Sequence, residues 1–140
     1  MKVLLAVDGS DYTRRMLAYL AANPELLGKE PEITVYHGLM ALPHHAANVV
    51  GAADVRRWQE SELEKVFRPI RAFFAQQGVA ANYVDRVGPV ADGIAAYADD
   101  GRFDLVVMGS HGHGELAGLV MGSVATRVLA RCRVPALIIR

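Results

Sequence analysis

Short apolar segments that alternate with helical periods set the strongest limit on the fold of this 140-residue chain. The segments are short and mostly rich in β-branched residues, which is typical of strands buried on both faces. Strands that alternate with helices are joined by right-handed crossovers and form a parallel sheet covered on both faces. The predicted strands are residues 3–7, 33–37, 79–87, 103–108 and 136–139.

In most of the intervals between these strands apolar residues recur at helical spacing. We therefore predict helices at residues 11–22, 52–77, 90–98 and 119–131. Ser10 is the candidate N-cap of the first helix, and Asn23-Pro24 ends it. In the long second helix Pro69 is expected to cause a kink or to end its first half, and Gly78 to stop it. Residues 39–51 are expected to be irregular, with the adjacent His44 and His45 exposed.

Composition favours a folded, soluble, single domain over residues 1–140, because 52% of the residues are hydrophobic and 21% are charged. The formal net charge is zero, which gives no electrostatic case for a nucleic acid or an anionic membrane as partner. No signal peptide or membrane span is visible, so we expect a cytoplasmic protein. Cys132 is the one cysteine, and a half-buried structural thiol is favoured over a reactive one.

The residues after the fourth predicted strand carry the clearest functional signal. Val106-Val107-Met108-Gly109-Ser110-His111-Gly112 leads from a strand into a glycine-rich turn, and Gly122-Ser123-Val124 opens the next helix. Glycine lets backbone N–H groups approach a phosphate, and a helix N-terminus adds unpaired donors and a positive dipole end. We therefore predict that this loop and the Ser123 hydroxyl hold a nucleotide phosphate tail. The alternative is a flexible loop in which Ser123 is an ordinary helix cap.

The spacing of these glycines resembles the signature of the ATP-binding branch of the universal stress protein family: Gly109, two residues, Gly112, nine residues, then Gly122-Ser123. The resemblance extends to KVLLAVDGS at residues 2–10, DLVVMG at residues 104–109 and the segment 134–140. It implies a Rossmann-like α/β sandwich of the adenine nucleotide alpha hydrolase-like type, with a five-stranded parallel sheet in the order 3-2-1-4-5. Ligands of such open sheets bind where the strand order reverses, beside strands 1 and 4.

The resemblance also gives the end of the first strand a role in nucleotide binding. It implies that Asp8 contacts the base or the ribose, and that Ala6 and Val7 line the adenine pocket through their backbone. A carboxylate suits ribose hydroxyls because these are hydrogen-bond donors. The alternative for Asp8 is an N-cap or an Asx turn at the first helix, and the two roles are compatible.

At the end of the second strand the chain departs from the family pattern. The family usually places a bulky aliphatic residue, packed on the adenine, after the strand's histidine, whereas here Gly38 follows His37. The glycine removes apolar contact worth about 1–2 kcal/mol. Leu39 or Met40 could fill the gap, and the departure puts adenine affinity in question.

The complete predicted nucleotide site is Ala6, Val7, Asp8, Gly38, Met108, Gly109, Ser110, His111, Gly112, His113, Gly114, Glu115, Gly122, Ser123 and Val124. Within it we expect His111 and His113 to donate to phosphate. The alternative is a transition-metal site formed by this histidine pair with Glu115. We predict no metal site made by the protein, and expect Mg²⁺ to arrive with ATP, held by phosphates and water.

No catalytic residue is assigned, because the loop lacks both a P-loop lysine and the spacing of a nucleophile elbow. The predicted function is that of an ATP-binding universal stress protein: a nucleotide-dependent regulatory or protective factor with an unknown regulatory partner and little or no hydrolysis. Two alternatives remain. One is a dimeric stress protein that binds no nucleotide, and the other is a weak ATPase or adenylyl-transfer enzyme on the same fold.

The closing segment, residues 134–140, is apolar and would lie at an edge of the sheet. In the family this edge pairs across a two-fold axis, so the resemblance implies a homodimer through Val134, Ala136 and Ile138. The alternative is a buried terminal strand in a monomer.

Overall fold

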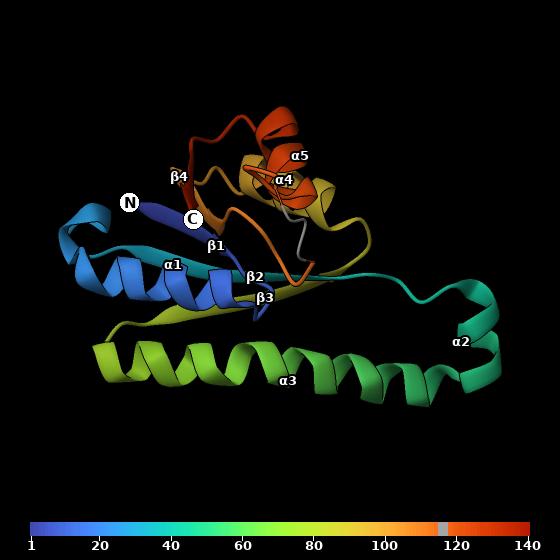
Figure 1. Cartoon of the computed structure of the whole chain (residues 1–140). Helices are drawn as coiled ribbons and strands as arrows, with labels where there is room; N and C mark the ends of the chain where they lie inside the picture. Colours follow the sequence, from blue (N-terminus) through green and yellow to red (C-terminus); the bar gives the residue numbers. More distant parts are fainter. Residues whose placement is uncertain (115–117) are drawn as a thin grey trace.

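Strands and helices alternate along the chain as predicted in the computed structural model, which describes residues 1–114 and 118–140 (Figure 1). The elements are β1 (Lys2–Ala6), α1 (Asp11–Ala22), the 3₁₀ turn η1 (Pro24–Leu27), β2 (Glu32–Leu39), α2 (His44–Val50), α3 (Ala52–Gln77), β3 (Ala81–Val87), α4 (Val90–Asp100), β4 (Leu105–Gly109), α5 (Ser123–Arg131) and β5 (Ala136–Ile139).

The five strands form one parallel sheet in the order β3-β2-β1-β4-β5, which confirms the predicted fold class. Helices α1 and α3 cover one face, and α4 and α5 cover the other (Figure 1). At its carboxyl end β1 pairs Ala6 with Tyr36 of β2 on one side and with Met108 of β4 on the other. The loops that follow β1 and β4 therefore leave the sheet side by side, where the strand order reverses.

Each face of the sheet has its own core. Leu5 and Val107 face α1 and α3, and pack with Met16 and Ile70 of those helices. Leu4 and Val106 face α4 and α5, and pack with Ile94 and Val128. Neighbouring residues of the central strands thus point to opposite faces, and both are fully buried. This is why the central strands are continuous apolar runs rather than alternating ones.

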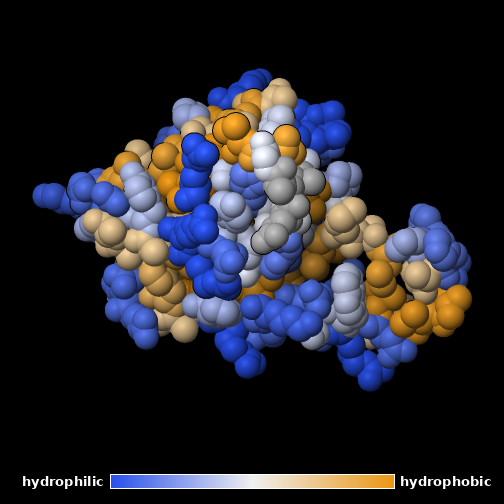
Figure 2. Space-filling model, in the orientation of Figure 1, coloured by the Kyte–Doolittle hydropathy of each residue, from blue (hydrophilic) through white to orange (hydrophobic). Residues whose placement is uncertain are grey.

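The prediction that residues 39–51 are irregular is wrong. Strand β2 continues to Leu39, and residues 44–50 form α2. Helix α2 buries none of its residues and packs on α3 beyond the end of the sheet, so its sequence carries no amphipathic period. His44 and His45 are exposed as expected. Val49 is 86% exposed, so α2, which protrudes from the rest of the molecule, carries apolar atoms on its surface (Figure 2).

Helix α3 runs without interruption from Ala52 to Gln77 (Figure 1). Of the two effects predicted for Pro69, an end of the helix's first half is therefore wrong, and a kink stays a prediction. Pro69 cannot donate to the carbonyl of Lys65, but both residues are exposed and water can bond that carbonyl instead. Gly78 ends the helix as predicted, with a left-handed backbone (φ 66°, ψ 25°) and an N–H that donates to the Ala75 carbonyl.

The last helix is shorter than predicted, because α5 begins at Ser123 rather than at residue 119. Leu119 and Val120 are exposed before it, so their apolar side chains are not part of its buried face. Cys132 follows α5 and is half-buried, as expected. Its Sγ donates to an Asp99 carboxylate oxygen at 3.7 Å, and burial raises the pKa of this thiol above its ordinary value, which disfavours the reactive thiolate.

In the described part of the chain, no helix is both long enough and apolar enough to cross a bilayer.

Candidate functional site

A cleft of about 530 Å³ opens at the carboxyl ends of β1, β2 and β4. It is lined by most of the residues that we predicted to bind a nucleotide: Ala6, Val7, Asp8, Gly38, Met108, Gly109, His111, Gly112, His113, Gly114, Gly122, Ser123 and Val124. Glu115 lies outside the described residues. The fold thus brings the turn after β1 and both glycine-rich elements after β4 to one place.

Ser110 does not line the cleft, although we predicted that it contacts the ligand. Its side chain is 1% exposed, and its hydroxyl hydrogen-bonds Nδ1 of His111 at 2.9 Å. Its backbone bonds β5 through its N–H and accepts the N–H of Gly122 through its carbonyl, at 2.7 Å in both cases. Ser110 therefore joins the start of the loop to its end through the hydrogen bond from Gly122.

The Asp8 carboxylate shapes the turn after β1. Its Oδ1 accepts the N–H of Ser10 at 2.9 Å and the hydroxyl of Thr13 at 3.1 Å, which makes the Asx turn that we named as the alternative role. Ser10 occupies the N-cap position as predicted, but its hydroxyl makes no capping bond and has no partner among the described residues. Asp8 and Thr13 bond the N–H groups of the turn before the helix, those of Asp8, Gly9 and Ser10. Within the described chain Oδ2 of Asp8 has no hydrogen bond and faces Gly112.

Three glycines of the loop after β4 are required by close packing. A Cβ at Gly109 would lie 2.5 Å from Tyr12 Cβ, and one at Gly112 would lie 2.6 Å from Oδ2 of Asp8. A Cβ at Gly122 would lie 3.1 Å from the Ser110 carbonyl oxygen. The loop therefore lies directly against the turn after β1 and against its own return segment, and a side chain at any of these positions would force a neighbouring group to move.

The N-terminus of α5 supplies backbone donors to the cleft. The Gly122 N–H is already bonded to Ser110, so it is not one of the phosphate donors that we expected. The next three residues, Ser123, Val124 and Ala125, form the first turn and line the cleft. First-turn N–H groups have no partner inside a helix, and the glycine N-cap has no side chain to bond them. Their donors and the dipole of the helix favour an anion here.

Both histidines of the loop bond to the protein itself. His113 donates from Nε2 to the Asp8 carbonyl at 2.6 Å and so ties the loop to the turn after β1. His111 donates from Nε2 to the Leu119 carbonyl at 3.0 Å, and its Nδ1 is bonded to Ser110. Because both ring nitrogens of His111 have protein partners, this arrangement does not support the prediction that His111 donates to phosphate.

Val90, which sequence reasoning missed, explains the unusual glycine after His37. A Cβ at Gly38 would lie 2.9 Å from Cγ1 of Val90, so the side chain from α4 fills the space above the strand. Val90 lines the cleft together with Met40 and Ile94. Of the two residues expected to fill the gap, Met40 does line the cleft and Leu39 is buried elsewhere. Helix α4 thus contributes part of the apolar wall through Val90 and Ile94.

Helix α3 brings a charged pair to the cleft that no motif indicated. Glu62 and Lys65 both line it, and Nζ of Lys65 donates to Oε1 of Glu62 at 2.8 Å. Val66, the next residue, packs on Gly9, where a Cβ would lie 3.3 Å from its Cγ2. The glycine-rich loop contains no lysine, so the cation of this cleft comes from a distant part of the sequence.

A metal-binding cluster is not seen among residues 1–114 and 118–140, where no three His, Cys, Asp or Glu side chains come together. The alternative metal site that includes Glu115 falls outside these residues.

Comparison with known proteins decides the family. The model of the universal stress protein family matches residues 1–140. The chain belongs to the universal stress protein family. It is 31% identical to Universal stress protein Slr1230 of Synechocystis, over 99% of the chain but 42% of that protein. It is 27% identical to Universal stress protein YxiE of Bacillus subtilis, over 99% of the chain and 98% of that protein.

Solved structures of the family share the fold. UspA of Lactobacillus plantarum matches with a TM-score of 0.77 and 18% identity, over 100% of this chain and 97% of that one. A universal stress protein of Arabidopsis thaliana with AMP bound matches with a TM-score of 0.68 and 16% identity, over 99% and 90%. A universal stress protein in complex with cAMP matches with a TM-score of 0.65 and 22% identity, over 100% and 97%.

Proposed function

We propose that the chain binds an adenine nucleotide, with Mg²⁺-ATP as the expected ligand, and acts as a nucleotide-dependent regulatory or protective factor of the cytoplasmic stress response. The observation that carries this proposal is the meeting of three elements in one cleft: the Asp8 turn, the glycine-rich loop and the free N-terminus of α5. The AMP and cAMP complexes of two related proteins support the ligand class.

The chemistry of the cleft suggests how the ligand lies in it. The phosphates would accept from the N–H groups of Ser123, Val124 and Ala125, where the helix dipole favours negative charge. Oδ2 of Asp8 would accept from a ribose hydroxyl. The adenine would lie against the apolar wall that includes Val90.

Little or no hydrolysis is expected, because phosphoryl transfer needs a residue that orients the attacking water and carboxylates that hold the metal ion. Asp8 and Glu62 are the carboxylates that line the described part of the cleft. Oδ1 of Asp8 is used by the turn, and Glu62 is paired with Lys65. Mg²⁺ would therefore be held by the nucleotide and by water.

Calorimetric titration with ATP, ADP and cAMP, with and without Mg²⁺, tests the proposal on the wild type and on Gly114→Val. Gly114 lines the cleft, and a Cβ there meets no atom of the described residues within 4 Å, unlike one at Gly122. A side chain at this position takes up open space without straining the loop. We expect saturable binding by the wild type and at least tenfold weaker binding by Gly114→Val at an unchanged melting temperature.

Ala75→Val adds similar bulk at an exposed position near the far end of α3 and serves as the matched control, with unchanged binding. Absence of binding by the wild type to all three nucleotides would reject the proposal and favour the alternative of a nucleotide-free interaction protein. Equal binding by Gly114→Val and the wild type would place the ligand outside the glycine-rich loop.

We also propose that β5 pairs with β5 of a second copy to form a homodimer. Strand β5 is an edge of the sheet, and the apolar side chains of Val134, Ala136 and Ile138 are only partly buried against the core. The carbonyls of Pro135 and Ile139 accept N–H groups of β4 and its following residue. Because successive residues of a strand direct their backbone groups to opposite sides, those of Ala136 and Ile138 face the open edge.

Ala136→Pro removes an N–H from this open edge without removing a bond to β4, and sedimentation equilibrium measures the result. We expect the wild type at twice the chain mass of 15.2 kDa and Ala136→Pro at that single mass, with little loss of stability. Leu137→Pro is the matched control: its N–H faces β4, so it should lower the melting temperature instead. A monomeric wild type would reject the dimer.

A further inference from the structure

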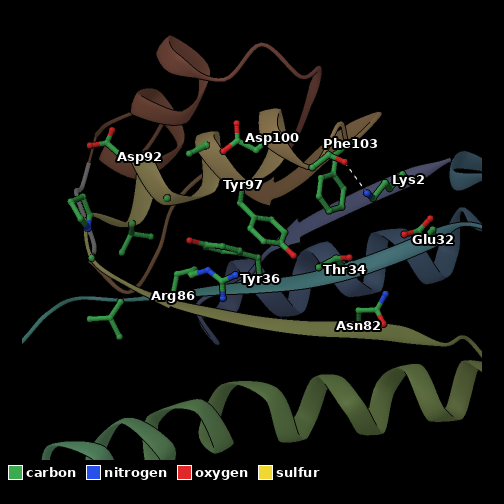
Figure 3. A pocket seen from close by; sticks show the side chains of 17 residues that line it. Lys2, Glu32, Thr34, Tyr36, Asn82, Arg86, Asp92, Tyr97, Asp100 and Phe103 are labelled. Atoms are coloured by element: carbon green, nitrogen blue, oxygen red, sulfur yellow. Dashed lines mark hydrogen bonds between the residues drawn. The ribbon is translucent and has the colours of Figure 1, made fainter.

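A second cleft, of about 900 Å³, lies on the other side of Val90 from the candidate nucleotide site. Its floor is the face of β2 and β3 that is turned toward α4, and its wall is α4 itself (Figure 3). We call this cleft the α4 groove. Of the residues that the structure describes, Val90 alone lines both clefts, so the groove is a separate surface.

Two residues of β2 present hydroxyl groups to the α4 groove. Tyr36 is 1% exposed and Thr34 is 4% exposed, and they stand two residues apart on the same face of the strand (Figure 3). Neither hydroxyl has a protein partner in the part of the chain that the structure describes, where Ser10 Oγ is the one fully buried side-chain oxygen without a hydrogen bond. Both hydroxyls of β2 are therefore open to the groove, where water or a ligand can bond them.

Helix α4 is adapted to the hydroxyl of Tyr36 rather than to its ring alone. A Cβ at Gly93 would lie 2.5 Å from the Tyr36 hydroxyl oxygen. Glycine is a poor helix former in a helix interior. A phenylalanine at position 36 would place the same ring without this oxygen, so Gly93 makes room for the hydroxyl itself.

Arg86 of β3 brings a positive charge to the same part of the groove (Figure 3). Its guanidinium lies 5.5 Å from the centre of the Tyr97 ring and donates to the carbonyl of Asp85. Among the described residues no carboxylate oxygen lies within 4.0 Å of it. The groove's Asp92 is held by Arg127 and Arg131 instead.

We propose that the α4 groove binds a small carboxylic acid with a flat apolar body, of the aromatic carboxylate class. The planar guanidinium of Arg86 matches a carboxylate, and the hydroxyl of Tyr36 donates to the same anion. The ring of the ligand packs against Tyr97, beside the hydroxyl of Thr34 (Figure 3).

The remaining charges of the groove favour a monoanion over a phosphate. Glu32 and Asp100 line it as well, and they would repel a doubly charged group. Lys2 lies at the other end of the groove from Arg86, where its Nζ donates to the Gly101 carbonyl and lies over the Phe103 ring (Figure 3). The aromatic wall likewise suits a ligand that is apolar outside its carboxylate.

NMR titration of the isotope-labelled full chain tests this proposal, with benzoate as the probe. Benzamide serves as the uncharged analogue, and inorganic phosphate as the competing anion. We expect saturable shifts at residues 34, 36, 93 and 97 with benzoate, at least fivefold weaker binding of benzamide, and no displacement by equimolar phosphate. We expect the same shifts with Gly114→Val, the variant that tests nucleotide binding in the other cleft. Failure of this proposal and failure of the nucleotide proposal can therefore be told apart.

Two variants locate the binding groups. Arg86→Gln, at an exposed position, should weaken benzoate binding at least tenfold, and Tyr36→Phe about threefold to fivefold without a loss of thermal stability. Arg57→Gln is the matched control, because Arg57 is exposed on α3 and paired with Asp54, so binding should not change. Absence of saturable shifts with benzoate, or equal binding by Arg86→Gln and the wild type, would overturn the proposal.

Discussion

Gly109→Ala is expected to lower the free energy of unfolding by about 1–3 kcal/mol and to disrupt the loop after β4. The added Cβ would lie 2.5 Å from Tyr12 Cβ and 3.3 Å from the His111 carbonyl oxygen. Tyr12 cannot retreat freely, because it belongs to the first turn of α1 and its ring packs on His111 at 5.1 Å. The loop or the helix must move, and urea unfolding measures the cost.

Gly114→Ala is the matched control in the same loop. Across residues 1–114 and 118–140, no atom lies within 4 Å of a Cβ at Gly114, and the backbone of this glycine is not in the left-handed region. We therefore expect its unfolding free energy to stay within about 0.5 kcal/mol of the wild type. Equal stability of the two variants would show that the close approach of Tyr12 to Gly109 does not exist in solution.

Phe67→Ala is expected to have the largest effect on stability, a loss of about 3–5 kcal/mol. Phe67 is 4% exposed and packs between α3 and the sheet, with its ring 5.4 Å from that of Tyr83 and 6.2 Å from that of His37. The guanidinium of Arg71 lies 5.6 Å from the ring centre and would lose this contact. Thermal and urea unfolding measure the loss.

The same substitution is expected to weaken nucleotide binding, under the proposed function. Phe67 supports the ring of His37, whose Nδ1 donates to the Val7 carbonyl at 2.7 Å, and both His37 and Val7 line the cleft. Trp58→Ala removes a larger ring from the same helix at a 40% exposed position, so it should cost about 1 kcal/mol or less. A similar loss in both variants would show that Phe67 is not part of the core.

The predictions from sequence agree best with the structure where apolar residues recur at a fixed spacing and so form one buried face. The bounds of α1 and α3 are as predicted, because their apolar residues recur at helical spacing and a turn or glycine ends each helix. Helix α2 was not predicted, since it buries no residue and so leaves no period to detect. The bound of α5 was wrong because exposed apolar residues precede it.

The same distinction holds for the candidate site: residues in one local motif could be predicted, and residues from distant elements could not. The glycine-rich loop could be located because its glycines recur at a short, regular spacing, and Gly109, Gly112 and Gly122 each lie against a neighbouring group. Lys65 and Val90 could not be located, since they lie on helices whose local sequence shows only an amphipathic pattern. The engagement of His111 with Ser110 and Leu119 was likewise invisible, because it depends on how the loop closes on itself.

By itself the sequence determined the α/β class, the parallel sheet and the place of the loop, because apolar periodicity and the demand for glycine are local properties of a chain. Only the tertiary structure decided which distant side chains share a cavity. It placed Val90 in the space that Gly38 leaves open, brought Lys65 to the nucleotide cleft, and set Tyr36 and Arg86 in one groove. These meetings depend on how helices pack across the sheet, which no local pattern encodes.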